Sequence, residues 1–255
     1  MRTTVPSSGG LKPLHDGLLL EAWERSSSAG DFGRASALLS AACPESSAEE
    51  WDTVGLPEVV LQLARLRQLS FGSGLTAYLP CSKCGARLEF EIDLAQIISR
   101  LETLSTETAV DWTCGGDRFS MRTINRQDLA EAGAQADRED AQWVLLRRCT
   151  QINGRPISTE NDAAALRASE TRAMEIFTQL HQGAEITFHV ACVECGHSEE
   201  TDLDMARFLW TEVRHRVGRL FHEVHELAAA YGWSEEAILN MPAPRRARYL
   251  EMIQS

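Results

Sequence analysis

Two cysteine pairs with the spacing Cys-x-x-Cys are the residues of this sequence best suited to chemistry. Cys81 and Cys84 form the first pair, Cys192 and Cys195 form the second, and a glycine follows each pair directly. Two thiolates three positions apart can point at one ion when the chain turns tightly between them, and the trailing glycine permits the positive φ that such a turn needs. Four thiolates from two facing turns make a closed tetrahedral shell, which predicts one structural Zn²⁺.

The two pairs lie unusually far apart along the chain. Ordinary zinc ribbons separate their cysteine pairs by roughly 15 to 20 residues, whereas more than 100 residues lie between Cys84 and Cys192. Alternating apolar and polar residues at 88–92 and 186–190 predict strands beside each pair. We therefore predict a split antiparallel zinc ribbon, with its first half at 75–93, a mostly helical insertion at 94–183 and its second half at 184–203.

Other roles for the cysteines are open at this point. A pair of redox motifs is disfavoured, because a thioredoxin-like Cys-x-x-Cys sits at a strand-to-helix junction and both pairs here lie between predicted strands. Cys114 could compete as a metal ligand, and His197, just after the second pair, could replace one cysteine. Cys43 and Cys149 lie near predicted helix ends and are interpreted as small core residues.

The sequence offers no recognisable catalytic constellation. A closed shell of four cysteines leaves no position for water or substrate, so the predicted metal is not catalytic. His222 and His225 flank Glu223 on a predicted helix, but a zinc protease requires its two histidines four positions apart, and these are three apart. We find no Walker A loop, no G-x-G-x-x-G and no G-x-S-x-G. We expect the protein not to be an enzyme.

Composition narrows the possible partners and location. The chain has 255 residues and a formal net charge of -12, so it repels phosphate backbones, which disfavours nucleic-acid binding. The N-terminal sequence does not have the features of a signal peptide, and the apolar runs are far shorter than the roughly 20 residues of a membrane span. Seven cysteines without an export signal indicate a reducing compartment, so we expect a cytoplasmic protein without a disulfide framework.

Periodicity outside the ribbon predicts helices. Val59, Leu63 and Leu66 recur in steps of four and three, and a long amphipathic helix begins near Asp204 and ends before Gly232. The fold class expected is therefore mainly α with a small antiparallel β zinc ribbon (α+β). Helices are expected at 32–42, 56–69, 94–101, 125–149, 159–181 and 245–253. The regions outside the split ribbon are a disordered N-terminus at 1–14, a helical region at 15–74 and a C-terminal helical region at 204–255.

Several short stretches resemble a known family. They are residues 18–25 (LLLEAWER), 66–72 (LRQLSFG), 88–90 (LEF), 118–129 from Arg-Phe to Asp-Leu, 231–239 (YGWSEEAIL) and 241–250. Their order resembles a family of zinc-ribbon proteins encoded with phage-like contractile injection systems. These proteins are similar to baseplate hub assembly chaperones of T-even-type phages.

The resemblance implies an assembly factor or component of the baseplate of a contractile tail-like particle, with baseplate or hub proteins as partners. Trp233, Ile238 and Tyr249 near the C-terminus could then dock a partner, or could simply close the core of the domain. The competing hypothesis is a zinc-ribbon regulator that contacts nucleic acid or polymerase. It predicts a basic face, for which the sequence offers only the arginines at 147–148 and 245–248.

Overall fold

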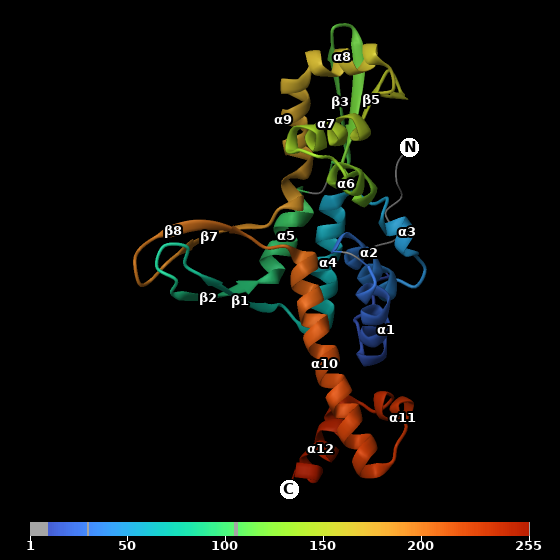
Figure 1. Cartoon of the computed structure of the whole chain (residues 1–255), viewed down its shortest axis with the longest axis vertical. Helices are drawn as coiled ribbons and strands as arrows, with labels where there is room; N and C mark the ends of the chain where they lie inside the picture. The colour runs from blue at the N-terminus through green and yellow to red at the C-terminus, as the bar shows by residue number, and fades with distance from the viewer. Residues whose placement is uncertain (1–9, 30, 105–106, 255) are drawn as a thin grey trace.

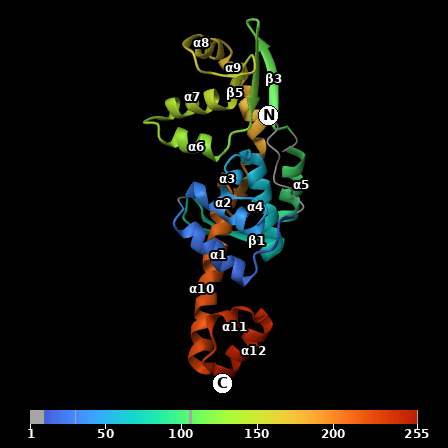
Figure 2. The same cartoon turned by 90° about the vertical axis from the view of Figure 1, so that its right-hand side faces the viewer.

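The computed structural model describes residues 10–29, 31–104 and 107–254. A central helical body carries three projections: a module built on a four-stranded sheet, an arm of two β-hairpins and a C-terminal helical module (Figure 1). Seen after a quarter turn, the sheet module, the central helices and the C-terminal module follow one another along the long axis (Figure 2). The fold is mostly helical with small antiparallel sheets, which confirms the predicted mixed class.

The central body buries the largest apolar core of the described residues. Leu63 and Leu66 on one helix pack in the same cluster as Leu38, Leu209 and Val213 from others. The helices that supply the core are α1 (Asp16–Ser27), α2 (Asp31–Ala42), α3 (Ala48–Trp51), α4 (Leu56–Phe71), α5 (Leu94–Leu104) and the first half of α10 (Met205–Tyr231).

Local sequence explains where these helices begin and end. Pro57 lies in the first turn of α4, where its missing N–H is not needed, and Gly72 ends the helix with a φ of 90°. Gly232 ends α10 in the left-handed conformation, as predicted. Of the segment predicted to be disordered, residues 1–9 lie outside the described residues, whereas Leu14 is buried in the central core and its N–H donates to Ser70 Oγ at 3.0 Å.

The sheet module has a core of its own. Trp112 and Phe119 stack at 5.0 Å across the hairpin β3 (Ala109–Cys114) and β4 (Asp117–Arg122), and both are buried. The sheet continues with β5 (Thr150–Ile152) and β6 (Arg155–Pro156) in the order β3-β4-β5-β6. Helices α6 (Arg126–Gly133), α7 (Arg138–Cys149), α8 (Glu160–Ala168) and α9 (Glu170–His181) pack around it.

The sequence prediction was wrong about details of this module. The single helices expected at 125–149 and 159–181 are each broken into two, because the Asp137 side chain caps a new helix and Ser169 leaves the helical conformation with a ψ of 15°. Strands β5 and β6 were not predicted. They join through a tight turn in which Asn153 and Gly154 both have positive φ, as a two-residue hairpin requires.

The predicted insertion at 94–183 does not behave as one block. Helix α5 at its start contributes Leu94, Ile98 and Leu101 to the central core, not to the core of the sheet module. The sheet module therefore begins with β3.

The C-terminal module is held to the body by charge. Arg246 on α12 (Ala243–Gln254) is almost fully buried and pairs with Asp16 of α1 and, at 2.9 Å, with Glu223 of α10. Arg216 completes the network, at 3.1 Å from Asp16 and 3.2 Å from Glu223. Two carboxylates and two guanidiniums balance one another, so the burial of Arg246 is compensated. The short helix α11 (Glu235–Leu239) closes the module.

The arm consists of two separate hairpins. Strand β1 (Gly74–Pro80) pairs with β2 (Arg87–Asp93), and β7 (Thr187–Ala191) pairs with β8 (Ser198–Asp202). Both hairpins leave the central body in the same direction and lie side by side (Figure 1), with the Phe90 and Phe188 rings 6.2 Å apart between them. The strands predicted around each cysteine pair are therefore confirmed.

Candidate metal centre

Each Cys-x-x-Cys pair occupies the tight turn at the tip of one hairpin. In the first turn, the Cys81 N–H donates to the Ala86 carbonyl at 2.8 Å and the Gly85 N–H donates to the Cys81 carbonyl at 2.9 Å. The second turn repeats both bonds at the same lengths, from Cys192 to the His197 carbonyl and from Gly196 to the Cys192 carbonyl. The two sequence-distant turns therefore have the same backbone structure.

The glycines make this turn possible. Gly85 and Gly196 have φ values of 74° and 69°, a region in which a side chain is strained. With the chain reversed in this way, both sulfurs of a pair lie on the same side of the turn, so the trailing glycine in the sequence has the structural role that its position predicted.

The structure brings the four predicted cysteines together. Their sulfur atoms all lie within 4.8 Å of one another, and the two shortest separations between the turns are 3.8 Å for Cys81–Cys195 and 3.7 Å for Cys84–Cys192. Tetrahedral coordination with metal–sulfur bonds of about 2.3 Å places neighbouring sulfurs about 3.8 Å apart. The four side chains therefore fit a tetrahedral metal ion without rearrangement.

The four sulfurs lie at the edge of the protein, with one side of the cluster covered by side chains and the other side facing solvent. Cys81 and Cys192 are buried, Cys195 is half-buried and Cys84 is exposed. Leu88 is buried together with Cys81 and Cys192, and Leu79 and Val190 pack against this cluster. This cluster is too small to hold two hairpin tips by itself, because an isolated two-stranded hairpin is marginally stable at best.

The thiol pKa values indicate how a cation would stabilise the cluster. Backbone N–H groups of Cys84 and Lys83 lower the pKa of Cys81 to about 7, so this thiol ionises readily. At Cys195 the His197 backbone N–H also favours the thiolate, but burial and the neighbouring thiols outweigh it and raise the pKa to about 12. One thiolate forms easily while the last resists ionisation beside the others, and a divalent ion removes that repulsion.

A contact between the turns was not anticipated from the sequence. The Glu199 carboxylate at the start of β8 accepts a hydrogen bond from the Ser82 N–H in the other hairpin at 3.1 Å. Hydrogen bonds from the Ser82 side chain and from this N–H lower the pKa of Glu199. The residue bridges the two halves of the arm beside the sulfurs, and no spacing rule in the sequence pairs it with Ser82.

The base of the arm is fixed by a second unpredicted group. Arg67 on α4 is buried and makes a bidentate ion pair with Glu212 of α10, at 2.9 and 2.8 Å. Its remaining nitrogen donates to the carbonyls of Gly72 and Gly74, at 2.6 and 2.7 Å, just where β1 begins. One guanidinium therefore joins two core helices to the first strand of the arm.

The other candidate ligands do not join the sulfur cluster. Cys114 ends strand β3 in the sheet module, and Cys43 packs in the central core. Cys149 is buried in the core of the sheet module, where burial raises the pKa of its thiol to about 12. His197 contributes its backbone carbonyl to the second turn. Among the described residues, only the four cysteines form a group of side chains close enough to share one ion.

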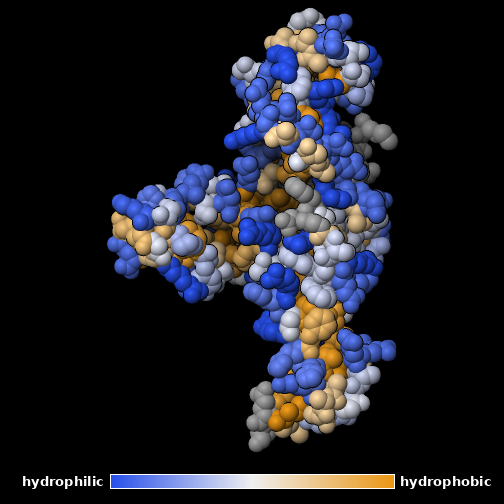
Figure 3. Space-filling model, in the orientation of Figure 1, coloured by the Kyte–Doolittle hydropathy of each residue, from blue (hydrophilic) through white to orange (hydrophobic). Residues whose placement is uncertain are grey.

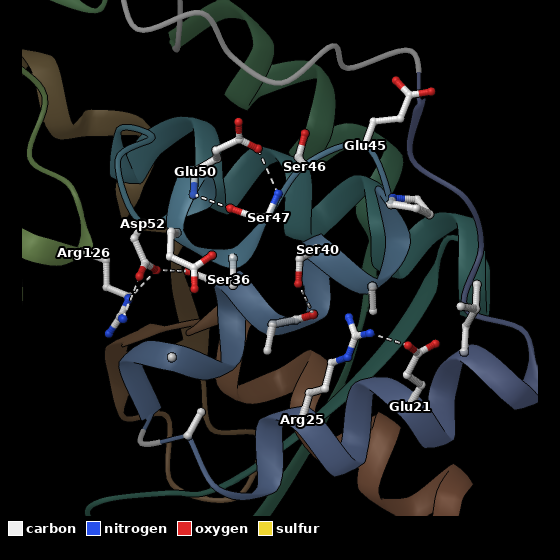
Figure 4. A pocket seen from close by; sticks show the side chains of 18 residues that line it. Glu21, Arg25, Ser36, Ser40, Glu45, Ser46, Ser47, Glu50, Asp52 and Arg126 are labelled. Atoms are coloured by element: carbon white, nitrogen blue, oxygen red, sulfur yellow. Dashed lines mark hydrogen bonds and ion pairs between the residues drawn. The ribbon is translucent and has the colours of Figure 1, made fainter.

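A polar groove of the central body lies elsewhere. It has a volume of about 850 Å³ and lies along α1, α2 and α3 (Figure 4). Several of its polar groups make contacts within the protein. Ser47 and Glu50 form the capping box of α3. The Asp52 carboxylate accepts a hydrogen bond from the Ser36 hydroxyl and pairs with Arg126 at 2.7 Å. These contacts hold the helices together and link the central body to α6.

Comparisons with known proteins add no assignment. No protein-family model, no curated protein and no solved structure matches the chain. Among the described residues, no helix combines the length and apolar character needed to cross a lipid bilayer.

Proposed function

We propose that Cys81, Cys84, Cys192 and Cys195 bind one structural Zn²⁺ that closes a zinc ribbon split between two distant parts of the chain. Soft thiolate ligands in a tetrahedral arrangement are typical of zinc. The separations of 3.7 and 3.8 Å between sulfurs of opposite turns carry this proposal. A closed shell of four protein ligands offers no position to a substrate, which supports a structural and not a catalytic ion.

We further propose that the protein is a non-enzymatic assembly factor or component of the baseplate of a contractile phage-tail-like injection system. The family resemblance of the sequence is the basis for this particular system. Baseplate or hub proteins are then its partners, and the cell cytoplasm, where such particles assemble, is its location.

The shape of the molecule supports a role in presenting surfaces. The chain exposes 14676 Å², whereas a compact monomer of 28.3 kDa exposes about 11,200 Å². The difference of roughly 3,500 Å² exceeds the total area buried in a standard protein interface, about 1,600 Å². Three projections spread this surface in different directions around the central body (Figure 1 and Figure 3), an arrangement suited to holding several partners.

A co-purification experiment tests the proposal. The tagged protein is co-expressed with the hub and baseplate subunits of a contractile particle, and bound subunits are identified by mass spectrometry. We expect at least one hub or baseplate subunit at stoichiometric amounts. Binding of none of them, together with salt-sensitive binding to duplex DNA, would instead favour the nucleic-acid regulator.

The metal is tested separately on the purified protein. Elemental analysis is expected to find about one zinc per chain, and Cys84→Ser is expected to lose it. Cys43→Ser, a change of the same type outside the cluster, is the matched control and keeps the metal.

A further inference from the structure

The outward face of α10 carries positive charge in an otherwise acidic protein. Residues 205–255 contain seven arginines and six glutamates and so carry a net charge of +1, which leaves -13 for the rest of the chain. Along α10, a stripe of exposed basic and imidazole side chains follows the helix. It consists of Arg207, Arg214, His215, Arg219, His222 and His225.

Of the three glutamates of α10, two pair with residues outside this stripe, and Glu226 lies beside a residue of the stripe. Glu212 pairs with Arg67, Glu223 pairs with Arg216 and Arg246, and Glu226 lies 3.2 Å from His222. In the described part of the chain, Arg207, Arg214 and Arg219 have no ion-pair partner. These three arginines lie on a single exposed face of α10 and form a distinct charged surface.

Gly218 lies in the middle of the same face. A glycine inside a helix costs stability relative to alanine, and no close contact among the described residues explains this one, because a Cβ at Gly218 would meet none of their atoms within 4 Å. The exposed surface there is a shallow, open depression lined by Arg214, His215, Gly218, Arg219, His222 and Glu223. A missing side chain at the centre of a charged stripe lets another backbone approach closely.

We propose that this face of α10 binds an acidic helical segment of a partner protein. The stripe from Arg207 to His225 is about 27 Å long, the length of a five-turn helix. The gap at Gly218 allows side chains of the incoming helix to fit between those of α10, in the manner of helix packing. Phe221 borders the stripe with 43% of its surface exposed and supplies an apolar contact beside the charges.

Charge selects this occupant over nucleic acid. A helix of one partner covers only the stripe, whereas a long phosphate backbone would continue past α10 to the acidic strands of the arm, where β8 carries Glu199, Glu200 and Asp202. The proposal is independent of the metal centre, because α10 and the sulfur cluster are separate surfaces.

The experiment uses the full-length, zinc-loaded protein and a fluorescein-labelled 20-residue acidic helical peptide with glutamates along one face. Fluorescence anisotropy measures its binding at 50 and 300 mM NaCl. The variants are the charge reversal Arg214→Glu/Arg219→Glu and the steric block Gly218→Leu. The matched control is Arg100→Glu/Arg138→Glu, which makes the same charge change at two exposed arginines on α5 and α7.

We expect the charge reversal, the steric block and the higher salt each to weaken binding about ten-fold or more, while the control binds as the parent does. No peptide binding, or equal loss in the control, would refute the proposal. Displacement of the peptide by a 20-base-pair DNA duplex would assign the face to nucleic acid. A concentration-dependent dimer, seen by light scattering and abolished by the charge reversal, would assign it to a second copy of the chain; either result also overturns the proposal.

Discussion

Removal of the metal is expected to release the tip of the arm while the central body stays folded. The two turns, 81–86 and 192–197, comprise twelve residues whose ordering costs about 12 kcal/mol at about 1 kcal/mol each. Burial of Leu88 returns about 2 kcal/mol, and the four backbone hydrogen bonds of the turns return about 1 kcal/mol each. About 6 kcal/mol is left for the metal to supply.

The proposed zinc ion would supply a binding free energy of the required size. Structural zinc sites have binding free energies of about 10 to 16 kcal/mol, so a Kd near 0.1 nM is reasonable. At about 1 μM free zinc, such an affinity stabilises the bound state by about 5.5 kcal/mol. The ordered tip and the metal therefore depend on each other.

Hydrogen exchange measured by mass spectrometry checks this prediction. Chelation is expected to reduce the protection of amides in 81–86 and 192–197 by up to about 10⁴-fold, which corresponds to about 5.5 kcal/mol. Amides of α4 and of the first half of α10 serve as the internal control, since their protection depends on the central core. Unchanged exchange in both turns after the metal is removed would refute the reasoning.

Three other outcomes are expected. Asp128→Asn lowers the unfolding free energy in urea by about 3 kcal/mol, because Arg122 and Arg148 lose their shared buried carboxylate; a loss under about 1 kcal/mol argues against this. Burial raises the pKa of the Asp128 carboxyl, but its hydrogen bonds, above all from Arg122, have the larger effect, so the pKa in the folded protein lies below its ordinary value. The stabilisation by this carboxylate is therefore present above about pH 4 and is lost as the pH falls below it. Burial lowers the pKa of His181, so the unfolded chain takes up a proton on this ring more readily than the folded protein does. The contribution of His181 to stability is therefore complete above about pH 6.5 and declines as the pH falls, and a His181→Gln variant lacks that step in its stability profile. Arg246→Ala leaves Asp16 and Glu223 paired with Arg216 but removes the link to α12, which limited proteolysis detects as faster cleavage after Gly232; unchanged cleavage contradicts this role of Arg246.

The buried histidine illustrates a contact that only the fold creates. The ring of His181 accepts a hydrogen bond from the Ile124 N–H at 2.8 Å through Nε2, while Nδ1 lies 2.6 Å from the Phe177 carbonyl. This pattern requires the neutral ring with its proton on Nδ1. In the sequence, His181 is only the last residue of a predicted helix, 57 positions away from its partner.

Local features could be read directly from the sequence. Asn125 with Asp128 predicted a helix start, and the structure contains the complete capping box. Gly232 predicted the end of α10, and alternation predicted the strands beside both cysteine pairs. These features depend on backbone conformation within a few residues, and such preferences persist whatever the rest of the chain does.

Features that join distant segments could not be read in the same way. Strands β5 and β6 contain three and two residues, too few for an alternating pattern to be recognised, and they form only in the sheet, where β5 pairs with β4 and β6 with β5. The role of Arg67 could not be predicted, because its partner Glu212 lies on α10, far away in the sequence. The sequence assigned α5 to the insertion, whereas in the structure its apolar face packs in the central core.

The sequence by itself determined the two turns at the hairpin tips, because Cys-x-x-Cys-Gly specifies both the ligand atoms and the positive φ that aligns them. Only the tertiary structure decided that the four sulfurs of Cys81, Cys84, Cys192 and Cys195 meet within 4.8 Å. The physical reason is that the meeting depends on where α4, α5 and α10 hold the bases of two hairpins, and the packing of a core is a property of the whole chain.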